Sequence, residues 1–224
     1  MLELTADECR VLGVLIEKST TTPDQYPLSL NAITNGANQK NNRDPVMSMT
    51  DDQAFEAVEG LRGKGLLVRM DQSGSRVSKF RHQATEVLHA RTGELAILAE
   101  LLMRGPQTLG ELRGRASRMS PMDSLEVPKD LLRALMERPE PYVKLIPPSP
   151  GSRAERYQQL FCDSLHPVDH VGESHEPPHD SASSIATSST AQTIATLQAK
   201  VEQLSGEVAE LRIRLDRLTQ SLGG

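Results

Sequence analysis

The stretch TDDQAFEAVEGLRGKGLLVRMDQSGSRVSKFR, residues 50–81, contains the pattern that decides the fold. Its first four residues form a capping box, which opens a helix predicted to bury one stripe of apolar side chains, namely Phe55, Val58 and Leu61. Gly65 is predicted to end this helix, because glycine readily adopts the left-handed conformation found there. Residues 66–70 and 76–81 flank a turn-forming segment and predict a β-hairpin.

The sequence before this stretch predicts two further helices. Residues 5–8 form another capping box, and apolar residues at helical spacing follow it up to a polar loop that begins at Thr20. A short second helix around Leu30 and Ile33 is expected to end near Gly36. The order helix, helix, helix, hairpin is that of a winged helix, a helix-turn-helix variant with a β wing.

The second half of the chain repeats this order. Helices are predicted over 94–103, 108–118 and 127–138, and strands over 142–146 and 153–161. The two hairpins match at an offset of 77 residues, at which Gly74, Ser75, Arg76, Lys79 and Phe80 correspond to Gly151, Ser152, Arg153, Arg156 and Tyr157. The sequence therefore predicts a mainly α fold with small β-hairpin wings (α+β), built from two tandem winged-helix domains, 1–92 and 93–162.

A linker and a coiled-coil helix are predicted after these domains. Residues 163–192 are rich in Ser and Pro with few large apolar side chains, which is typical of a disordered linker. Across 193–222, apolar residues recur every three and then four positions, with mostly β-branched residues at a and Leu at d. This pattern favours a parallel two-stranded coiled coil, and so a homodimer joined through residues 194–222. The alternative is a single amphipathic helix that docks on its own domains.

Charge and composition exclude several function classes. The net charge is −5, from 25 basic and 30 acidic residues. Residues 163–224 hold 4 of the basic and 9 of the acidic residues, so the first 162 residues are neutral overall and a local basic patch remains compatible with nucleic acid. The sequence contains no phosphate-binding glycine loop and no cysteine pair at metal spacing, so we expect neither an enzyme nor a cofactor or metal site.

Features of secretion and membrane insertion are also missing from the sequence. No run of eighteen apolar residues occurs and no signal peptide is visible at the N-terminus. The two cysteines, Cys9 and Cys162, are too few for a disulfide framework. We therefore expect a cytoplasmic protein without a membrane span.

Two segments of the first domain are candidate DNA contacts. The loop that begins at Asn38 is made of amide and cationic side chains, which can contact phosphates or base edges; the alternative is a structural loop held by turns and a local ion pair. The first hairpin is basic, as suits phosphate contact, although cations there also block edge-to-edge pairing of strands. The predicted DNA-binding residues are Asn38, Gln39, Lys40, Asn41, Asn42, Arg43, Arg69, Arg76, Lys79 and Arg81.

A third cationic segment extends from Arg104 to Arg115 and, with Arg118, contains four arginines and one acid. It spans a helix end, a tight turn and the start of a capped helix. Capping by Thr108 and Glu111 alone explains much of this pattern, so turn formation is the favoured interpretation.

One feature argues against DNA reading by the third helix, which in a helix-turn-helix normally enters the major groove. Here that helix carries Asp51, Asp52, Glu56 and Glu59, which phosphates would repel. If the first domain binds double-stranded DNA, the Asn-rich loop and the hairpin are expected to do so. The alternative function is a protein–protein interaction adaptor that uses its winged helices without DNA.

Three motifs resemble the YceH-like family of uncharacterised bacterial proteins. They are Tyr26-Pro-Leu-Ser-Leu-Asn31, Asn38-Gln-Lys-Asn-Asn-Arg-Asp-Pro45 and Arg104-Gly-Pro-Gln-Thr-Leu-Gly-Glu-Leu-Arg113. The resemblance covers about residues 3 to 162 and implies a tandem winged-helix fold in a bacterial cytoplasm. It implies no activity, because a fold alone does not define function.

Overall fold

The first helix, α1 (Ala6–Thr21), lies at the centre of the fold. Thr5 caps it, and Glu8 completes the predicted capping box. Every residue from Glu8 to Glu17 is buried, so α1 is covered on all sides by other elements. In this computed structural model the described residues are 2–71, 77–148 and 154–166, and they all belong to one compact unit.

The first half contains the predicted helices and a three-stranded sheet. After α1 come a 3-10 turn η1 (Pro23–Gln25), β1 (Leu28–Ser29), α2 (Leu30–Ala37), α3 (Asp51–Gly63), β2 (Leu67–Met70), β3 (Lys79–His82) and α4 (Ala84–Val87). The sheet is antiparallel in the order β1-β3-β2. Gly65 has a φ of 74°, as the predicted helix stop requires.

Two expectations for this half need correction. Phe55 does not belong to the buried stripe of α3, because its side chain is 49% exposed while Ala54, Val58 and Leu61 are buried. Val77 and Ser78, which were predicted to belong to the returning strand, lie before β3, and β3 begins at Lys79. The sequence analysis also missed β1, in which Leu28 pairs with Phe80. A two-residue strand is too short to show an alternating pattern.

The second half repeats the order of the first. It contains α5 (Thr92–Arg104), α6 (Leu109–Ala116), α7 (Glu126–Met136), β4 (Val143–Ile146) and β5 (Arg156–Gln159). Strands β3 and β5 each have four residues and start 77 positions apart, which confirms that the predicted offset relates two strands. An isolated bridge joins Gln107 to Tyr157, in the place that the β1–β3 pairing occupies in the first half.

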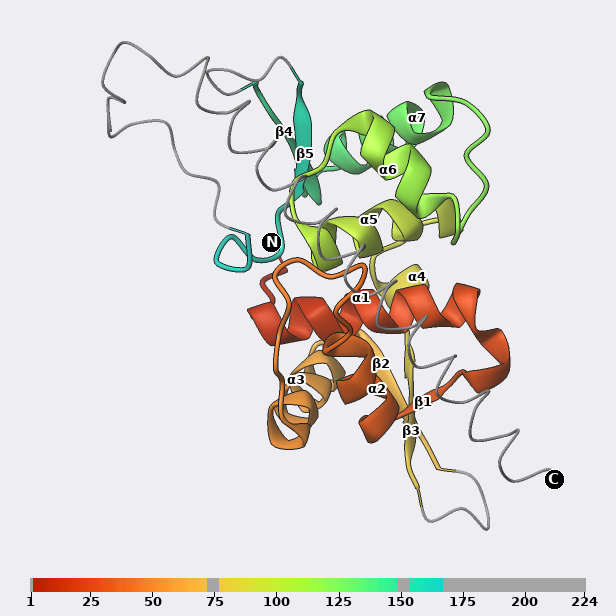
Figure 1. Cartoon of the computed structure of the whole chain (residues 1–224), viewed down its shortest axis with the longest axis vertical. Coiled ribbons are helices and arrows are strands. Elements are labelled where there is room, and N and C mark those ends of the chain that lie inside the picture. The colour runs from red at the N-terminus through yellow and green to blue at the C-terminus, as the bar shows by residue number, and fades with distance from the viewer. Residues whose placement is uncertain (1, 72–76, 149–153, 167–224) are drawn as a thin grey trace, which may run out of the picture. The chain divides into compact units, whose positions relative to one another are not determined.

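The two halves pack on each other through their first helices, α1 and α5, which lie side by side (Figure 1). A Cβ atom at Gly13 would lie 2.7 Å from Cγ of Met103 and 3.4 Å from Cβ of Leu102, so glycine permits this close approach. The buried apolar residues of both halves form one hydrophobic cluster.

The fold is thus mixed α and β, with seven helices and two small antiparallel sheets among the described residues. Within that part of the chain, no helix is long and apolar enough to cross a membrane. The predicted coiled coil, most of the predicted linker (167–192) and Arg76 lie outside the described residues.

Candidate functional site

The Asn-rich loop begins with a structural contact. The side-chain amide of Asn38 donates to the backbone oxygen of Met49 at 2.7 Å, and its oxygen accepts from the Met49 backbone N–H at 2.7 Å. These two bonds join the start of the loop to the segment that enters α3. Asn38 therefore shapes the loop, in line with the structural alternative, and its amide is not free to read a base edge.

Arg43 is buried rather than available to DNA. Its side chain has 0% exposure, and its guanidinium lies 2.5 Å from the Glu17 carboxylate on α1. It also donates to the backbone oxygens of Gly36, at 3.0 Å, and Asn42, at 2.8 Å. Because protein groups occupy its donors, we remove Arg43 from the set of expected phosphate contacts.

The other loop residues are exposed, but they differ in their contacts. Gln39 accepts a hydrogen bond from Arg43 at 3.1 Å. Asn42 has a φ of 62° and accepts a hydrogen bond from Arg104 of the second half. Lys40 and Asn41 have no ion pair or side-chain hydrogen bond among the described residues, so they remain available to a partner.

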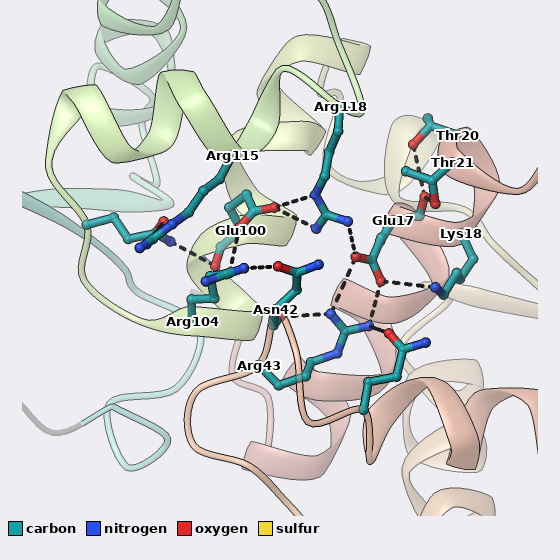
Figure 2. A network of polar contacts seen from close by, with 12 residues as sticks. Glu17, Lys18, Thr20, Thr21, Asn42, Arg43, Glu100, Arg104, Arg115 and Arg118 are labelled. Atoms are coloured by element: carbon teal, nitrogen blue, oxygen red, sulfur yellow. Dashed lines mark hydrogen bonds and ion pairs between the residues drawn. The ribbon is translucent and has the colours of Figure 1, made fainter. Parts of the chain in front are cut away.

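Glu17 links this loop to the second half of the chain. Arg118, which follows α6, contacts Glu17 and also Glu100 of α5, at 2.7 Å. Arg104 in turn lies 3.3 Å from Glu100. Figure 2 shows Arg43, Arg104 and Arg118 around the carboxylates of Glu17 and Glu100. Arg115 lies beside them and pairs with Glu111 at 3.2 Å. We call the whole set the seam network; its members are Glu17, Lys18, Asn42, Arg43, Glu100, Arg104, Glu111, Arg115 and Arg118.

Two carboxylates of the seam network are almost fully buried, with 1% exposure for Glu17 and 0% for Glu100. Burial would raise the pKa of Glu17, but hydrogen bonds and charges from Arg43 and Arg118 outweigh it and hold that pKa below its ordinary value. Glu17 therefore stays ionised and pairs with arginines from both halves.

The segment from Arg104 to Arg115 combines the predicted capping with a contact to this network. Thr108 and Glu111 form a capping box at the start of α6. Gln107 is buried, donates to the Glu100 backbone oxygen at 3.1 Å and accepts from Arg115 at 2.7 Å. The same segment thus provides the turn that the sequence predicted and two arginines at the seam.

The cations of the first hairpin lie on two faces. Lys79 and Arg81 alternate with buried Phe80 along β3, so they share the outer face of the sheet. Neither has an ion-pair partner among the described residues. Arg69 lies opposite Phe80 in the register, on the other face, and pairs with Asp71 at 2.9 Å.

Comparisons with known proteins identify the family. Residues 4–152, which include every residue of the seam network, match the family model described as "Protein of unknown function, DUF480". The chain belongs to the DUF480 family. A UPF0502 protein of Shewanella oneidensis is 42% identical over 226 residues, covering 99% of this chain and 100% of that protein. One from Pelobacter propionicus is 45% identical over 215 residues and covers 95% of each chain.

The resemblance to YceH-like proteins agrees with this assignment to a family of uncharacterised bacterial proteins. A further DUF480 relative, a UPF0502 protein of Geotalea daltonii, is 49% identical over 155 residues, or 69% of this chain and 71% of that protein. The matches to the Shewanella oneidensis and Pelobacter propionicus proteins cover 99% and 95% of this chain, so both include at least part of residues 194–222.

Sequence reasoning about this DUF480 protein missed both acidic members at the centre of the seam. Glu17 and Glu100 stand inside apolar helices, where a single acid looks like part of a solvated face. The available signal was the sequence around them: residues 8–17 and 94–103 are apolar around most of the helix, as in a helix that is buried on every side. A carboxylate in such a run requires a cationic partner.

A small cavity beside His82 also lies where the two halves meet. Its volume is about 110 Å³, and its polar lining includes Ser19, Thr20, Thr85 and Thr92. The His82 Nδ1 atom accepts from the Ala84 backbone N–H at 3.3 Å, and Nε2 lies 3.2 Å from the Ser19 hydroxyl. The ring is therefore a neutral imidazole that donates to Ser19.

His82 makes the stability of the protein sensitive to acid. Burial lowers the pKa of His82 to about 4, with Arg81 lowering it and Glu86 raising it to smaller extents. Because the folded pKa lies below the unfolded value of about 6.5, the unfolded chain binds more protons, and stability falls as the pH drops from 6.5 to 4. As the pH falls from 7 to 4.5, protonation of His82 is expected to lower the free energy of unfolding by about 2–3 kcal/mol.

Urea unfolding at the two pH values measures this effect. On acidification from pH 7 to pH 4.5, the free energy of unfolding of His82→Asn is expected to fall by about 2–3 kcal/mol less than that of the wild-type protein. The matched control, His89→Asn, changes an exposed histidine and is expected to follow the wild type. An equal loss in His82→Asn and the wild type would contradict the assignment of a buried neutral imidazole.

Proposed function

We propose that each half of this protein is a winged helix, and that the chain binds double-stranded DNA as a regulatory homodimer. The element order supports the fold: three helices precede a hairpin in each half, and the first sheet adds a short strand between the first two helices. The sequence pattern of residues 194–222 supports pairing through a parallel coiled coil. The proposal places the protein in the cytoplasm, where bacterial DNA lies.

The observation that carries the proposal is the outer face of β3. Lys79 and Arg81 stand there two residues apart without ion pairs among the described residues, so their charges are free to attract phosphates. Lys40 and Arg76 complete the proposed phosphate-contacting set. Arg69, which lies on the other face of the sheet and pairs with Asp71, is left out of it. Gln39, Asn41 and Asn42 remain candidates for positioning the loop or touching bases. A dimer would present two such surfaces to one duplex, as a two-fold symmetric site requires.

The outer face of α3 is left out of this interface. It exposes Asp51, Asp52 and Glu56, which would meet the phosphates with like charge. The hairpin, not this helix, is therefore proposed to make the main contact.

Lys79→Ala tests the hairpin as a phosphate contact. Loss of one contact is expected to weaken binding to all DNA sequences alike and to reduce the slope of log affinity against log salt by about one unit. Fluorescence anisotropy with a mixed-sequence duplex measures both quantities. Lys129→Ala is the control, because that ammonium lies 3.5 Å from Glu126 on α7. A slope that Lys79→Ala leaves unchanged would remove the hairpin from the interface.

One observation favours a second candidate, the protein–protein adaptor. Phe55 exposes 49% of its surface on α3, near three of the four carboxylates of that helix (Asp51, Asp52 and Glu56), a combination suited to a basic partner with an apolar pocket. The two candidates differ in one property: an adaptor would not bind a duplex even at low salt.

A further inference from the structure

The seam network carries more positive than negative charge. Its cationic members are Lys18, Arg43, Arg104, Arg115 and Arg118, and its acidic members are Glu17, Glu100 and Glu111. Two cationic charges therefore have no counterpart within the network. A purely structural set of ion pairs needs no such excess, since like charges at close range oppose one another.

The excess charge faces solvent. The side chains of Arg104, Arg115 and Arg118 are 20%, 35% and 31% exposed, while Glu17 and Glu100 are at most 1% exposed. The carboxylates thus lie beneath a layer of guanidinium groups. Figure 2 shows Arg104 and Arg115 on the same side of Glu100, with Asn42 of the first half reaching Arg104.

Arg104 has the least compensated charge in this layer. Its pKa is lowered chiefly by burial; the charge of Glu100 opposes this, and the smaller effects of Arg115, Arg118 and Arg43 each lower the pKa further. Its Nε atom is buried without a hydrogen-bond partner, although it lies 3.3 Å from the Glu100 carboxylate. Its bond to Asn42 uses one terminal nitrogen, which leaves the other terminal nitrogen without a partner among the described residues.

We propose that Arg104 and Arg115, with Asn42, bind a phosphate dianion at the seam between the two halves. Planar guanidinium groups bind phosphate oxygens in pairs, and two negative charges would offset the excess of two positive charges. Asn42 comes from the first half and the arginines from the second, so the bound anion would stabilise the contact between them. This site is separate from the β3 hairpin and does not depend on the proposed DNA contact there.

Arg115 offers the clearest test of this site. Its contacts, to Gln107 at 2.7 Å and to Glu111 at 3.2 Å, lie within the second half, so Arg115→Gln leaves the ion pairs of Glu17 and Glu100 in place. Arg115→Lys keeps the charge but loses the planar fork. The control is Arg133→Gln, which removes an exposed arginine paired with Asp130 on α7.

The experiment titrates the full chain with inorganic phosphate in a low-salt, phosphate-free buffer and follows binding by isothermal titration calorimetry. We expect one saturable site per chain with a Kd on the order of 1 mM, weakened at least about tenfold in Arg115→Gln, partly weakened in Arg115→Lys and unchanged in Arg133→Gln. Urea unfolding checks that each variant is folded. Saturable binding that Arg115→Gln leaves unchanged, or the absence of saturable binding to the wild type, would overturn the proposal.

A parallel titration with duplex DNA identifies where the phosphate comes from. If Arg115→Gln loses affinity for inorganic phosphate but keeps the wild-type affinity for the duplex, the site binds a free phosphate. If the variant loses affinity for both inorganic phosphate and the duplex, the site binds a phosphate of the DNA backbone. Because the inorganic phosphate arm does not involve DNA, failure of the proposed DNA binding leaves this test intact.

Discussion

Replacing Glu17 by Ala is expected to lower the free energy of unfolding by about 3–5 kcal/mol, the range found when one partner of a buried ion pair is removed. Glu17 is 1% exposed and pairs with Arg43, whose side chain is fully buried, and with Arg118 of the second half. The substitution leaves Arg43 charged, buried and without a carboxylate, and a stranded charge of this kind is the main source of the loss.

Urea unfolding of the wild type and Glu17→Ala measures this difference. The matched control is Glu59→Ala, which removes a 41% exposed carboxylate from its pair with Arg62 and is expected to change stability by less than about 1 kcal/mol. Similar small losses in both variants would show that Glu17 is not held as the structure places it.

The effect of Glu17→Ala should also depend on pH. Arginine partners lower the pKa of Glu17 in the folded state. Its contribution is therefore present above the unfolded pKa of about 4.3 and is lost as the pH falls through the lower folded pKa. The stability difference between the variant and the wild type is expected to shrink in strong acid.

Gly13→Val is expected to destabilise the protein by about 1–3 kcal/mol through overpacking. A Cβ at this position already meets Met103 at 2.7 Å, Leu102 at 3.4 Å and the Ala99 backbone oxygen at 3.5 Å. The Met103 side chain is flexible but fully buried, and the branched valine also meets the Leu102 Cβ and the backbone of α5. Helices α1 and α5 would have to separate, which would weaken the junction of the two halves.

Gly63→Val is the matched control for this prediction. Gly63 also lies in a helix, α3, but no heavy atom lies within 4 Å of a Cβ built there. We expect a change within about 0.5 kcal/mol, as for substitutions at open surface positions. Thermal or urea unfolding compares the two variants, and equal stability would mean that α1 and α5 are not in the close contact described.

The sequence predicted the positions of helices and strands better than it predicted which of their side chains are buried. Capping boxes at Thr5, Thr50 and Thr108 and the glycine at position 65 are local signals, and the structure contains all four. The offset between the hairpins also related two true strands. The prediction that Phe55 is buried was wrong. Its spacing fits the apolar stripe of the helix, but its exposure depends on how α3 packs against α1.

The candidate site was harder to predict, because its residues come together only in the folded chain. The Asn-rich loop and the segment after Arg104 were both identified as cationic motifs, but nothing in the sequence brought them side by side. Their meeting depends on the packing of α1 against α5 and on the buried acids Glu17 and Glu100. Arg43, predicted as a phosphate contact, illustrates this: its charge is used inside the protein.

The most direct test of the proposed DNA binding is the affinity of the purified chain for a mixed-sequence duplex at 50 and 200 mM salt, measured by fluorescence anisotropy. The four proposed contacts are Lys40, Arg76, Lys79 and Arg81. With this number, affinity is expected to fall by about two to three orders of magnitude between the two salt concentrations. The absence of binding at 50 mM, or an affinity that does not change with salt, would contradict the account and favour a protein partner.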